Sequence, residues 1–362
     1  MLKKFIKLTL STLLCTSLCI GTSLSFSNTV SAASVFAKGA DVGLLSQLES
    51  RGIKWEDTNG KQRDALEILK KHGINSVRLR VFVNPPSNFQ WTKRDGTTCL
   101  LGYCDTKGVV YMAKRAKKLG MRIMIDFHYS DHFADPSYQD KPAAWANDDF
   151  NQLQNDVYSH THYVMSALKN EGITPDWVQV GNEINSGLLW PDGNYKNFSN
   201  WAALTNEGYN AVKDVSPSSK VIIHLSSGAN NSLYRWAFDN LTKAGAKFDV
   251  IGMSYYPYWD NVDYTQNINA LKFNLNDMVS RYGKQVMITE IGGPESNPTN
   301  TCNMIKAVNK LVKDVPKKNG LGVFYWEPEA NSSVLPDSYP LGLCTKVSNN
   351  VLQFTSAIKA FK

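Results

Sequence analysis

The stretch that decides the fold is 176-DWVQVGNEIN-185. Its first half is an apolar, β-branched run, which is typical of a short strand buried on both faces. Its second half carries an amide and a carboxylate, Asn182 and Glu183, which a core would not bury without partners. Polar groups at the carboxyl end of a parallel strand are where α/β proteins place their sites. The stretch therefore predicts a core strand that delivers Asn182 and Glu183 to a functional site.

Seven further runs of this kind follow the same pattern, at 36–42, 74–83, 121–129, 220–227, 249–257, 285–292 and 320–327. The segments between the runs carry apolar residues at helical spacing, as in Ile268, Leu271, Leu275 and Met278. Six of these segments end on a glycine just before the next run, where glycine is the expected left-handed helix C-cap. These glycines are Gly73, Gly120, Gly172, Gly245, Gly283 and Gly320.

Alternation of eight strands with helices predicts parallel strands joined by helical crossovers. We expect residues 33–362 to form one α/β catalytic domain, a single (β/α)8 TIM barrel with its site on the loops after the strands. The alternative is a doubly wound open sheet. It is disfavoured because 39-GADVG-43, after the first run, lacks the glycine spacing of a phosphate-binding loop.

Residues 1–32 differ from the rest of the chain. Lys3, Lys4 and Lys7 precede the apolar run 8–24, and 30-VSA-32 offers a small-residue cleavage site. This order predicts a secretory signal peptide and a secreted, extracellular protein. A membrane anchor is the alternative, but serines and threonines dilute the apolar run and no basic stop-transfer flank follows.

Charge argues against nucleic acid as a partner. Removal of residues 1–32 would take away three lysines and no acids, which lowers the net charge from +7 to +4. The basic residues near 114–118 and 317–318 lie on helix-like segments without interleaved aromatics, so we expect solvated helix faces. We expect a monomer with no nucleic-acid or membrane partner and no cofactor.

Four cysteines remain after the leader: Cys99, Cys104, Cys302 and Cys344. No CxxC pair or histidine companion accompanies them, so in an exported protein disulfides are favoured over metal ligands. Four cysteines allow three connectivities. Proximity favours Cys99 with Cys104, which leaves Cys302 with Cys344.

A second carboxylate, Glu290 in VMITEIGG, closes the seventh run. In a closed barrel Glu183 and Glu290 would both face the mouth, although they are far apart in sequence. A pair of carboxylates is what cleavage of a glycosidic bond needs, one to protonate the leaving oxygen and one to attack or to activate water. Each could instead be a helix-capping or ion-paired acid, but two such residues, each after an apolar run, favour catalysis.

These residues resemble the Asn-Glu acid/base and the glutamate nucleophile of glycoside hydrolase clan A. The runs NSVRLRVFVNP, MIDFHYSDHFADP, VQVGNEIN, DVIGMSYYPYW, ITEIGGP and GVFYWEP together resemble family 53, the arabinogalactan endo-β-1,4-galactanases. The resemblance implies a polysaccharide substrate, the β-1,4-galactan of pectin side chains. The alternatives are a clan A enzyme acting on mannan, xylan or β-glucan, and a barrel that binds carbohydrate without cleaving it.

The resemblance also implies residue roles. Glu183 would be the acid/base and Glu290 the nucleophile of a retaining mechanism, with Asn182 donating to the sugar 2-hydroxyl. Either Arg78 or Arg80 could hold the nucleophile ionised, and one of the two could be an interior ion pair instead. The remaining substrate-binding candidates are His128 and Asp131 for sugar hydroxyls, and Tyr255, Tyr256 and Trp326 for stacking and for a hydrogen bond to the nucleophile.

Some bacterial members of the family hold calcium between the loops after strands seven and eight. Here the segment GGPESNPTNTCNMIKAV is short and carries no aspartate-rich run. We therefore expect no structural calcium or other metal. A Cys302–Cys344 bridge, as in the fungal-like arrangement, would brace the two loops instead.

Overall fold

The computed structural model describes residues 35–362. The expected signal peptide, residues 1–32, lies outside the described residues. Within the described part, none of the helices combines the length and apolar character needed to span a membrane.

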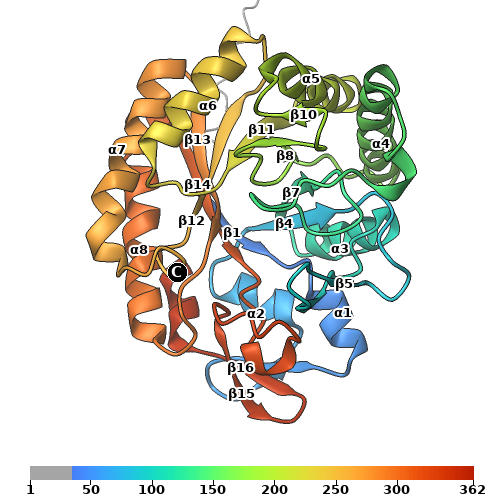
Figure 1. The fold of residues 1–362 in the computed structure, drawn as a ribbon. Helices are drawn as coiled ribbons and strands as arrows, with labels where there is room; N and C mark the ends of the chain where they lie inside the picture. The colour runs from blue at the N-terminus through green and yellow to red at the C-terminus, as the bar shows by residue number, and fades with distance from the viewer. Residues whose placement is uncertain (1–34) are drawn as a thin grey trace, which may run out of the picture. The chain divides into compact units, whose positions relative to one another are not determined.

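A closed barrel of eight parallel strands forms the centre of the fold (Figure 1). In chain order the strands are β1 (Ala37–Asp41), β4 (Ser76–Val81), β7 (Arg122–Phe127), β8 (Trp177–Val180), β11 (Lys220–Leu225), β12 (Val250–Tyr255), β13 (Gln285–Ile291) and β14 (Gly320–Trp326). Parallel pairing of β1 with both β14 and β4 closes the barrel. The expected (β/α)8 architecture is confirmed, and each expected run contains one barrel strand.

Helices surround the barrel as the crossovers between its strands (Figure 1). They are α1 (Leu45–Ser50), α2 (Ala65–Lys71), α3 (Thr106–Lys118), α4 (Phe150–Asn170), α5 (Phe198–Val215), α6 (Asn231–Lys243), α7 (Tyr264–Tyr282) and α8 (Pro298–Lys313). Short 3-10 turns are η1 (Ala143–Trp145), η2 (Pro316–Lys318), η3 (Ser332–Val334) and η4 (Ser356–Phe361). In α3, Val109, Met112 and Ala116 are buried while its lysines are exposed, as the pattern of a solvated basic face predicts.

Five of the six expected helix-terminal glycines have a positive φ, and Gly283 is the left-handed C-cap of α7 with φ 63°. Gly320 serves a different purpose. It is the first residue of β14, and a Cβ there would lie 1.8 Å from the carbonyl oxygen of Val312 in α8. Gly320 is therefore required by close backbone packing, and the expectation of a helix cap at this position was wrong.

Three small sheets were not predicted from the sequence. The strands β2 (Lys54–Glu56), β3 (Gln62–Arg63), β15 (Cys344–Ser348) and β16 (Val351–Phe354) form one sheet, at the lower edge of Figure 1. The hairpins β5 (Gln90–Thr92) with β6 (Thr98–Leu100) and β9 (Gly187–Leu188) with β10 (Gly193–Asn194) lie in the loops after β4 and β8. These hairpins lengthen the loops on the side of the barrel where the candidate site lies.

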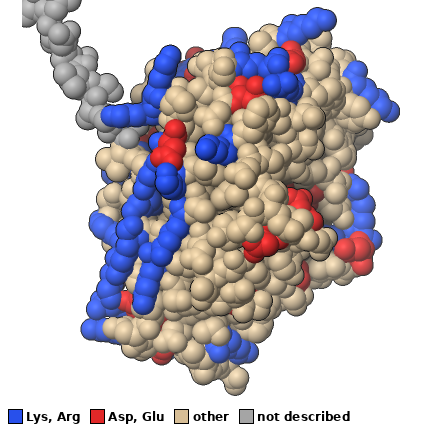
Figure 2. Space-filling view, turned by 90° about the vertical axis from the view of Figure 1, so that its left-hand side faces the viewer, with Lys and Arg blue, Asp and Glu red and all other residues tan. Residues whose placement is uncertain are grey.

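Lysine and arginine side chains gather along the left side of the face drawn in Figure 2. Most of that face is uncharged, basic side chains lie mainly towards its edges, and acidic side chains lie among them. This distribution agrees with the small net charge of the chain.

All four cysteines of the described residues are free thiols, so neither expected disulfide is present in the structure. The Cys104 thiol donates to the carbonyl oxygen of Gly43 at 3.4 Å, in a small cluster with Phe82 and Leu101. Cys99 instead lines the cleft that also contains Glu183 and Glu290. The Cys344 thiol likewise donates to the carbonyl oxygen of Pro328 at 3.5 Å. The Cys99–Cys104 pairing expected from proximity in sequence is not formed, because the two thiols face different surroundings.

Candidate active site

Glu183 and Glu290 line one cleft at the barrel mouth, with a volume of about 280 Å³. Glu290 is the sixth of the seven residues of β13, and its side chain points into this cleft. Glu183 follows β8 after a turn at Gly181, and it has an unusual positive φ of 46°. A non-glycine residue in this region is strained, and such strain persists where the surrounding structure holds it, often at functional sites.

Arg78 in β4 organises the floor of the cleft. Its Nη2 lies 2.8 Å from Glu290 Oε1 and 2.8 Å from Asp126 Oδ2, and its Nη1 donates to Asp41 Oδ2 at 2.6 Å. The guanidinium is buried, and its Nε donates to Gln179 Oε1 at 2.7 Å. The Arg78 guanidinium thus contacts three buried carboxylates and fixes the position of Glu290.

Asn182 is held beside that arginine by hydrogen bonds at both its amide oxygen and its amide nitrogen. Its Oδ1 accepts from Arg78 Nη2 at 2.8 Å, and its Nδ2 donates to the carbonyl oxygen of Ala134 at 2.7 Å. Because an amide nitrogen carries two hydrogens, Nδ2 keeps one donor for a ligand in the cleft. Asn182 is therefore buried but still presents a donor to the cleft that it lines.

A hydrogen-bond chain leads from buried His224 to Glu183. Gln179 Nε2 lies 2.9 Å from His224 Nδ1, and the Glu183 amide donates to the same nitrogen at 3.4 Å. His224 Nδ1 also lies 3.0 Å from Asn182 Oδ1, and His224 Nε2 lies 2.8 Å from Ser254 Oγ. The Ser254 hydroxyl then donates to Glu183 Oε1 at 2.6 Å. This chain fixes the orientation of Glu183.

The two glutamates sit in unlike electrostatic surroundings. Burial raises the pKa of Glu183 well above the usual carboxyl range, and the Glu290 charge raises it further. Burial also raises the pKa of Glu290, to about 7, while Arg78 and a hydrogen bond from Tyr256 at 3.1 Å act in the opposite direction. Arg78 and Tyr256 thus favour the ionised form of Glu290, whereas burial and the Glu290 charge favour the protonated form of Glu183.

His128 lines the cleft with both ring nitrogens already occupied. The amide of Ala134 donates to Nδ1 at 2.8 Å, and Nε2 lies 2.9 Å from Asp126 Oδ2. Burial lowers the pKa of His128, despite the opposing charge of Asp126. Both ring nitrogens are therefore engaged within the protein, and burial favours the neutral ring.

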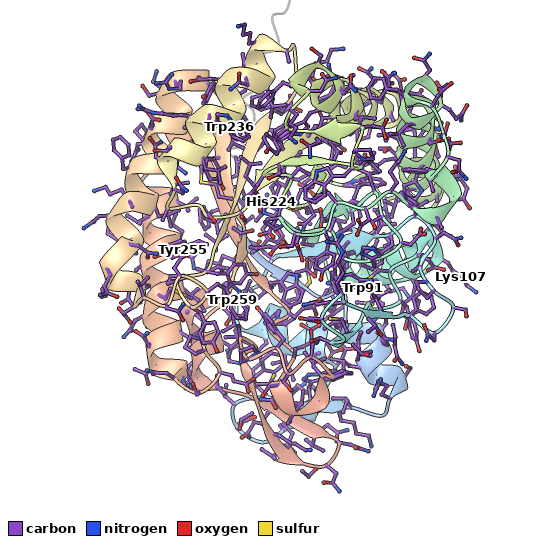
Figure 3. All side chains as sticks on the ribbon, viewed as in Figure 1. Trp91, Lys107, His224, Trp236, Tyr255 and Trp259 are labelled. Carbon is purple, nitrogen blue, oxygen red and sulfur yellow. The ribbon has the colours of Figure 1, made fainter. Side chains whose placement is uncertain are left out.

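Three expected site residues do not line the cleft that holds both glutamates, although Tyr255 lines an adjoining hollow together with Glu183. Both oxygens of Asp131 accept backbone amides, from Asn84 and from Ala143, each at 2.9 Å, and Asp131 does not line the cleft. The Tyr255 hydroxyl donates to Asn267 of α7 at 2.6 Å, and Figure 3 shows Tyr255 on the α7 side of the barrel. Arg80 pairs with Glu327 and Asp41, so it is the interior ion pair of the two arginines.

Aromatic rings form one wall of the cleft. Trp326, at the end of β14, packs edge-on against Tyr339 with ring centroids 4.6 Å apart. Trp259 is 54% exposed and lines the cleft together with Tyr256 and Phe133. Faces of this kind can pack against the C–H surfaces of a sugar.

Sequence reasoning missed Gln179, His224 and Ser254. The sequence contains a signal for these three residues, because each is a polar residue inside an otherwise apolar strand and would need a partner when buried. Trp259 belongs to the quoted SYYPYW run but was not singled out. Tyr339 lies in the long segment after β14, and nothing in its local sequence marks it as a cleft residue.

A carboxylate braces the loops after β13 and β14, where a disulfide was expected. Glu295 Oε2 accepts from Asn331 Nδ2 at 3.0 Å and from the Ser332 amide at 3.1 Å. The Glu295 amide donates to the carbonyl oxygen of Pro340 at 2.9 Å.

In residues 35–362 no group of three or more His, Cys, Asp or Glu side chains is arranged to hold a metal ion.

Comparisons with known proteins agree with this geometry. The sequence profile of glycosyl hydrolase family 53 matches residues 37–361. A probable arabinogalactan endo-β-1,4-galactanase A of Neosartorya fischeri is 35% identical over 354 residues, covering 91% of this chain and 90% of that protein. An arabinogalactan endo-β-1,4-galactanase of Humicola insolens is 34% identical over 314 residues, covering 80% of this chain and 89% of that protein.

The fold is also similar to that of a solved relative. The family 53 catalytic domain of Ignisphaera aggregans superposes with a TM-score of 0.77 at 31% identity, covering 90% of this chain and 95% of that chain. With a profile match along almost the whole described part, the chain belongs to glycosyl hydrolase family 53 and is a glycoside hydrolase.

Proposed function

We propose that this protein is an endo-β-1,4-galactanase that cleaves internal bonds of (arabino)galactan by a retaining double displacement. The observation that carries the proposal is the pair Glu183 and Glu290, which line one cleft with unlike partners. The names of the relatives support galactan as the substrate.

Glu290 is the proposed nucleophile. Arg78 and Tyr256 each bind one of its two oxygens, so the carboxylate is held in a fixed orientation for attack at the anomeric carbon. The partners also stabilise its ionised form, which is the reactive form. Attack gives a covalent glycosyl-enzyme as the bond to the leaving oxygen breaks.

Glu183 is the proposed acid/base. Its raised pKa keeps a proton available for the leaving oxygen in the first step, and its carboxylate then takes a proton from water in the second. Asn182 donates to the 2-hydroxyl through its free amide hydrogen. Trp326 and Tyr339 supply the stacking surface for the sugar on the mouth side of the pair.

The stereochemical test is proton NMR of the first product. A retaining mechanism requires carboxyl groups about 5 to 5.5 Å apart and gives a β-configured product before mutarotation. An α-configured first product would contradict the assignment of Glu290 as nucleophile.

The substrate test compares purified β-1,4-galactan with cellulose, mannan and xylan. We expect fast release of short oligosaccharides from galactan, because its linkage through an axial O4 bends the chain, whereas the equatorial linkages of cellulose, mannan and xylan give straighter chains that would not follow the same path through the cleft. Comparable rates on a glucan, mannan or xylan would favour another clan A activity. Binding of galactan without products would favour a non-cleaving barrel.

The proposed enzyme is exported and acts outside the cell as a monomer without a cofactor. Residues 1–32 are the proposed leader, and residues 33–362 the catalytic domain. N-terminal sequencing of protein recovered from culture medium would give the start of the mature chain. A start at Met1 would contradict cleavage after Ala32.

A further inference from the structure

A second hollow lies outside the catalytic cleft, on the α1 and α3 side of the barrel. It has a volume of about 670 Å³, and its wall is formed by α1, the start of α3 and the two ends of the β5–β6 loop. It shares none of its lining residues with the cleft that holds Glu183 and Glu290. Lys107, which lines this hollow, lies at the α3 edge in Figure 3, apart from Trp259 of the cleft.

Aromatic rings dominate one side of the hollow. Phe89 and Tyr103 pack edge to face with centroids 4.9 Å apart, and Tyr111 of α3 is 53% exposed. Phe89 also has a positive φ of 51°, which is rare for an aromatic residue. Exposed aromatic surface in a concave site is typical of ligand binding.

An unsatisfied hydroxyl lies in the same hollow. Ser46 of α1 is only 9% exposed and lines the hollow, and its Oγ has no hydrogen-bond partner in the structure. A buried polar group without a partner costs about 1–3 kcal/mol, so a ligand hydroxyl at this point would be favoured. Nearby, Ser50 Oγ and the Tyr103 hydroxyl lie 2.7 Å apart, and together they retain capacity for a further bond.

The hollow carries charges of both signs, and one of its two carboxylates is paired. The two oxygens of Glu49 accept from Arg115 at 2.7 and 2.8 Å. Asp105 caps α3 by accepting from the Gly108 amide at 2.8 Å, and Lys107 lies beside it in the chain. Aromatic faces, hydroxyls and charges of both signs together suit a neutral polyhydroxylated ligand better than an ion.

The hollow and the cleft share one loop. Lys93 and Cys99 of the β5–β6 loop line the cleft, whereas Phe89 and Tyr103, at its ends, line the hollow. Gln47 fixes this loop by donating to the Phe89 carbonyl oxygen at 3.0 Å and by accepting from the Gly102 amide at 2.8 Å. A polymer held at the hollow would therefore stay close to the cleft, which raises its effective concentration there.

We propose that this hollow is a second, non-catalytic binding site for a β-linked galactan chain. The proposal rests on the proposed galactanase function, since the ligand is the polymer that the cleft would cleave. Tyr111 supplies a face for a sugar ring, and Ser46 supplies a hydroxyl that pairs with one on the sugar. Cleavage of short oligosaccharides would not depend on this site, whereas the polymer would be held at a higher effective concentration near the cleft.

Retention of the inactive variant Glu290→Gln in galactan-containing native gels tests the proposal. Adding Tyr111→Ala or Ser46→Ala to that variant should weaken retention about three- to tenfold, as expected for loss of one aromatic or hydroxyl contact. The matched control is Tyr163→Ala, which removes a tyrosine that is 64% exposed and does not line the hollow. In the active enzyme, both hollow variants should raise KM for polymeric galactan and leave turnover of a short galacto-oligosaccharide unchanged.

Folding is monitored by thermal unfolding of each variant. Ser46→Ala breaks no hydrogen bond, so we expect its Tm to equal or exceed that of the parent while its binding falls. Retention of both hollow variants equal to that of Tyr163→Ala, in an enzyme that cleaves galactan, would overturn the second site alone. An enzyme that neither cleaves galactan nor is retained by it would overturn the proposed function as well.

Discussion

Ser254→Ala removes the hydroxyl that donates to Glu183 Oε1 at 2.6 Å. That hydrogen bond favours the ionised form of Glu183 and lowers its pKa, against burial and the Glu290 charge, which raise it. Without the hydroxyl, Glu183 should keep its proton to higher pH. In the proposed mechanism the protonated form is the acid of the first step, so the alkaline limb of kcat/KM should move upward.

The size of the effect follows from the hydrogen bond. A bond to a charged group contributes about 1.5–3 kcal/mol, and 1.36 kcal/mol corresponds to one pH unit, so the limb should move by roughly one to two pH units. Ser254 is 1% exposed, and its loss also leaves His224 Nε2 without its hydrogen-bond partner. We therefore expect a lower Tm as well, from an unfolding free energy reduced by about 1–3 kcal/mol.

The assay is kcat/KM on β-1,4-galactan from pH 4 to pH 10, about the range over which carboxyl groups of raised pKa titrate. The matched control is Ser227→Ala, which removes an exposed hydroxyl from a neighbouring loop of the barrel mouth. We expect the control to keep the parent profile. An alkaline limb that stays in place in Ser254→Ala, or moves downward, would refute the assignment of Glu183 as the acid held by Ser254.

Glu290→Gln should lose nearly all turnover on galactan and retain binding, as measured by initial rates and by calorimetry, and turnover above a few per cent would argue against a nucleophile at this position. Trp326→Ala should raise KM and lower kcat together, because the sugar loses a stacking face that also orients it. Burial raises the pKa of Glu327 to about 7 and that of Glu329 well above its usual range. Above pH of about 4.3, these two carboxyl groups therefore hold more protons in the folded state than in the unfolded state. Their contribution to stability falls as pH rises through this window. Glu329→Gln should therefore flatten the fall of Tm above neutral pH, whereas an unchanged slope would contradict a buried, protonated Glu329. EDTA should leave the Tm of the protein unchanged, and a sharp fall would reveal a structural metal.

The barrel could be predicted from local patterns. Apolar runs such as 176–183 form strands buried on both faces, and helix-terminal glycines such as Gly73 and Gly283 end the helices between them. Glu183 and Glu290 could be placed at the mouth for the same reason, because strand order and parallel pairing fix which end of each strand carries the site. The accessory hairpins escaped prediction because their strands are two or three residues long and carry no periodic signal.

The sequence by itself determined the architecture and the candidate glutamate pair, because strand and helix periodicity and strand-end chemistry are local properties. Only the tertiary structure decided which of two similar neighbours faces the cleft: Arg78 rather than Arg80, and Tyr256 rather than Tyr255. It also decided that the four thiols of the described chain lie apart as free cysteines. These outcomes depend on strand register and on loop packing between residues far apart in sequence, and no local pattern encodes the distance between two side chains that meet across a barrel.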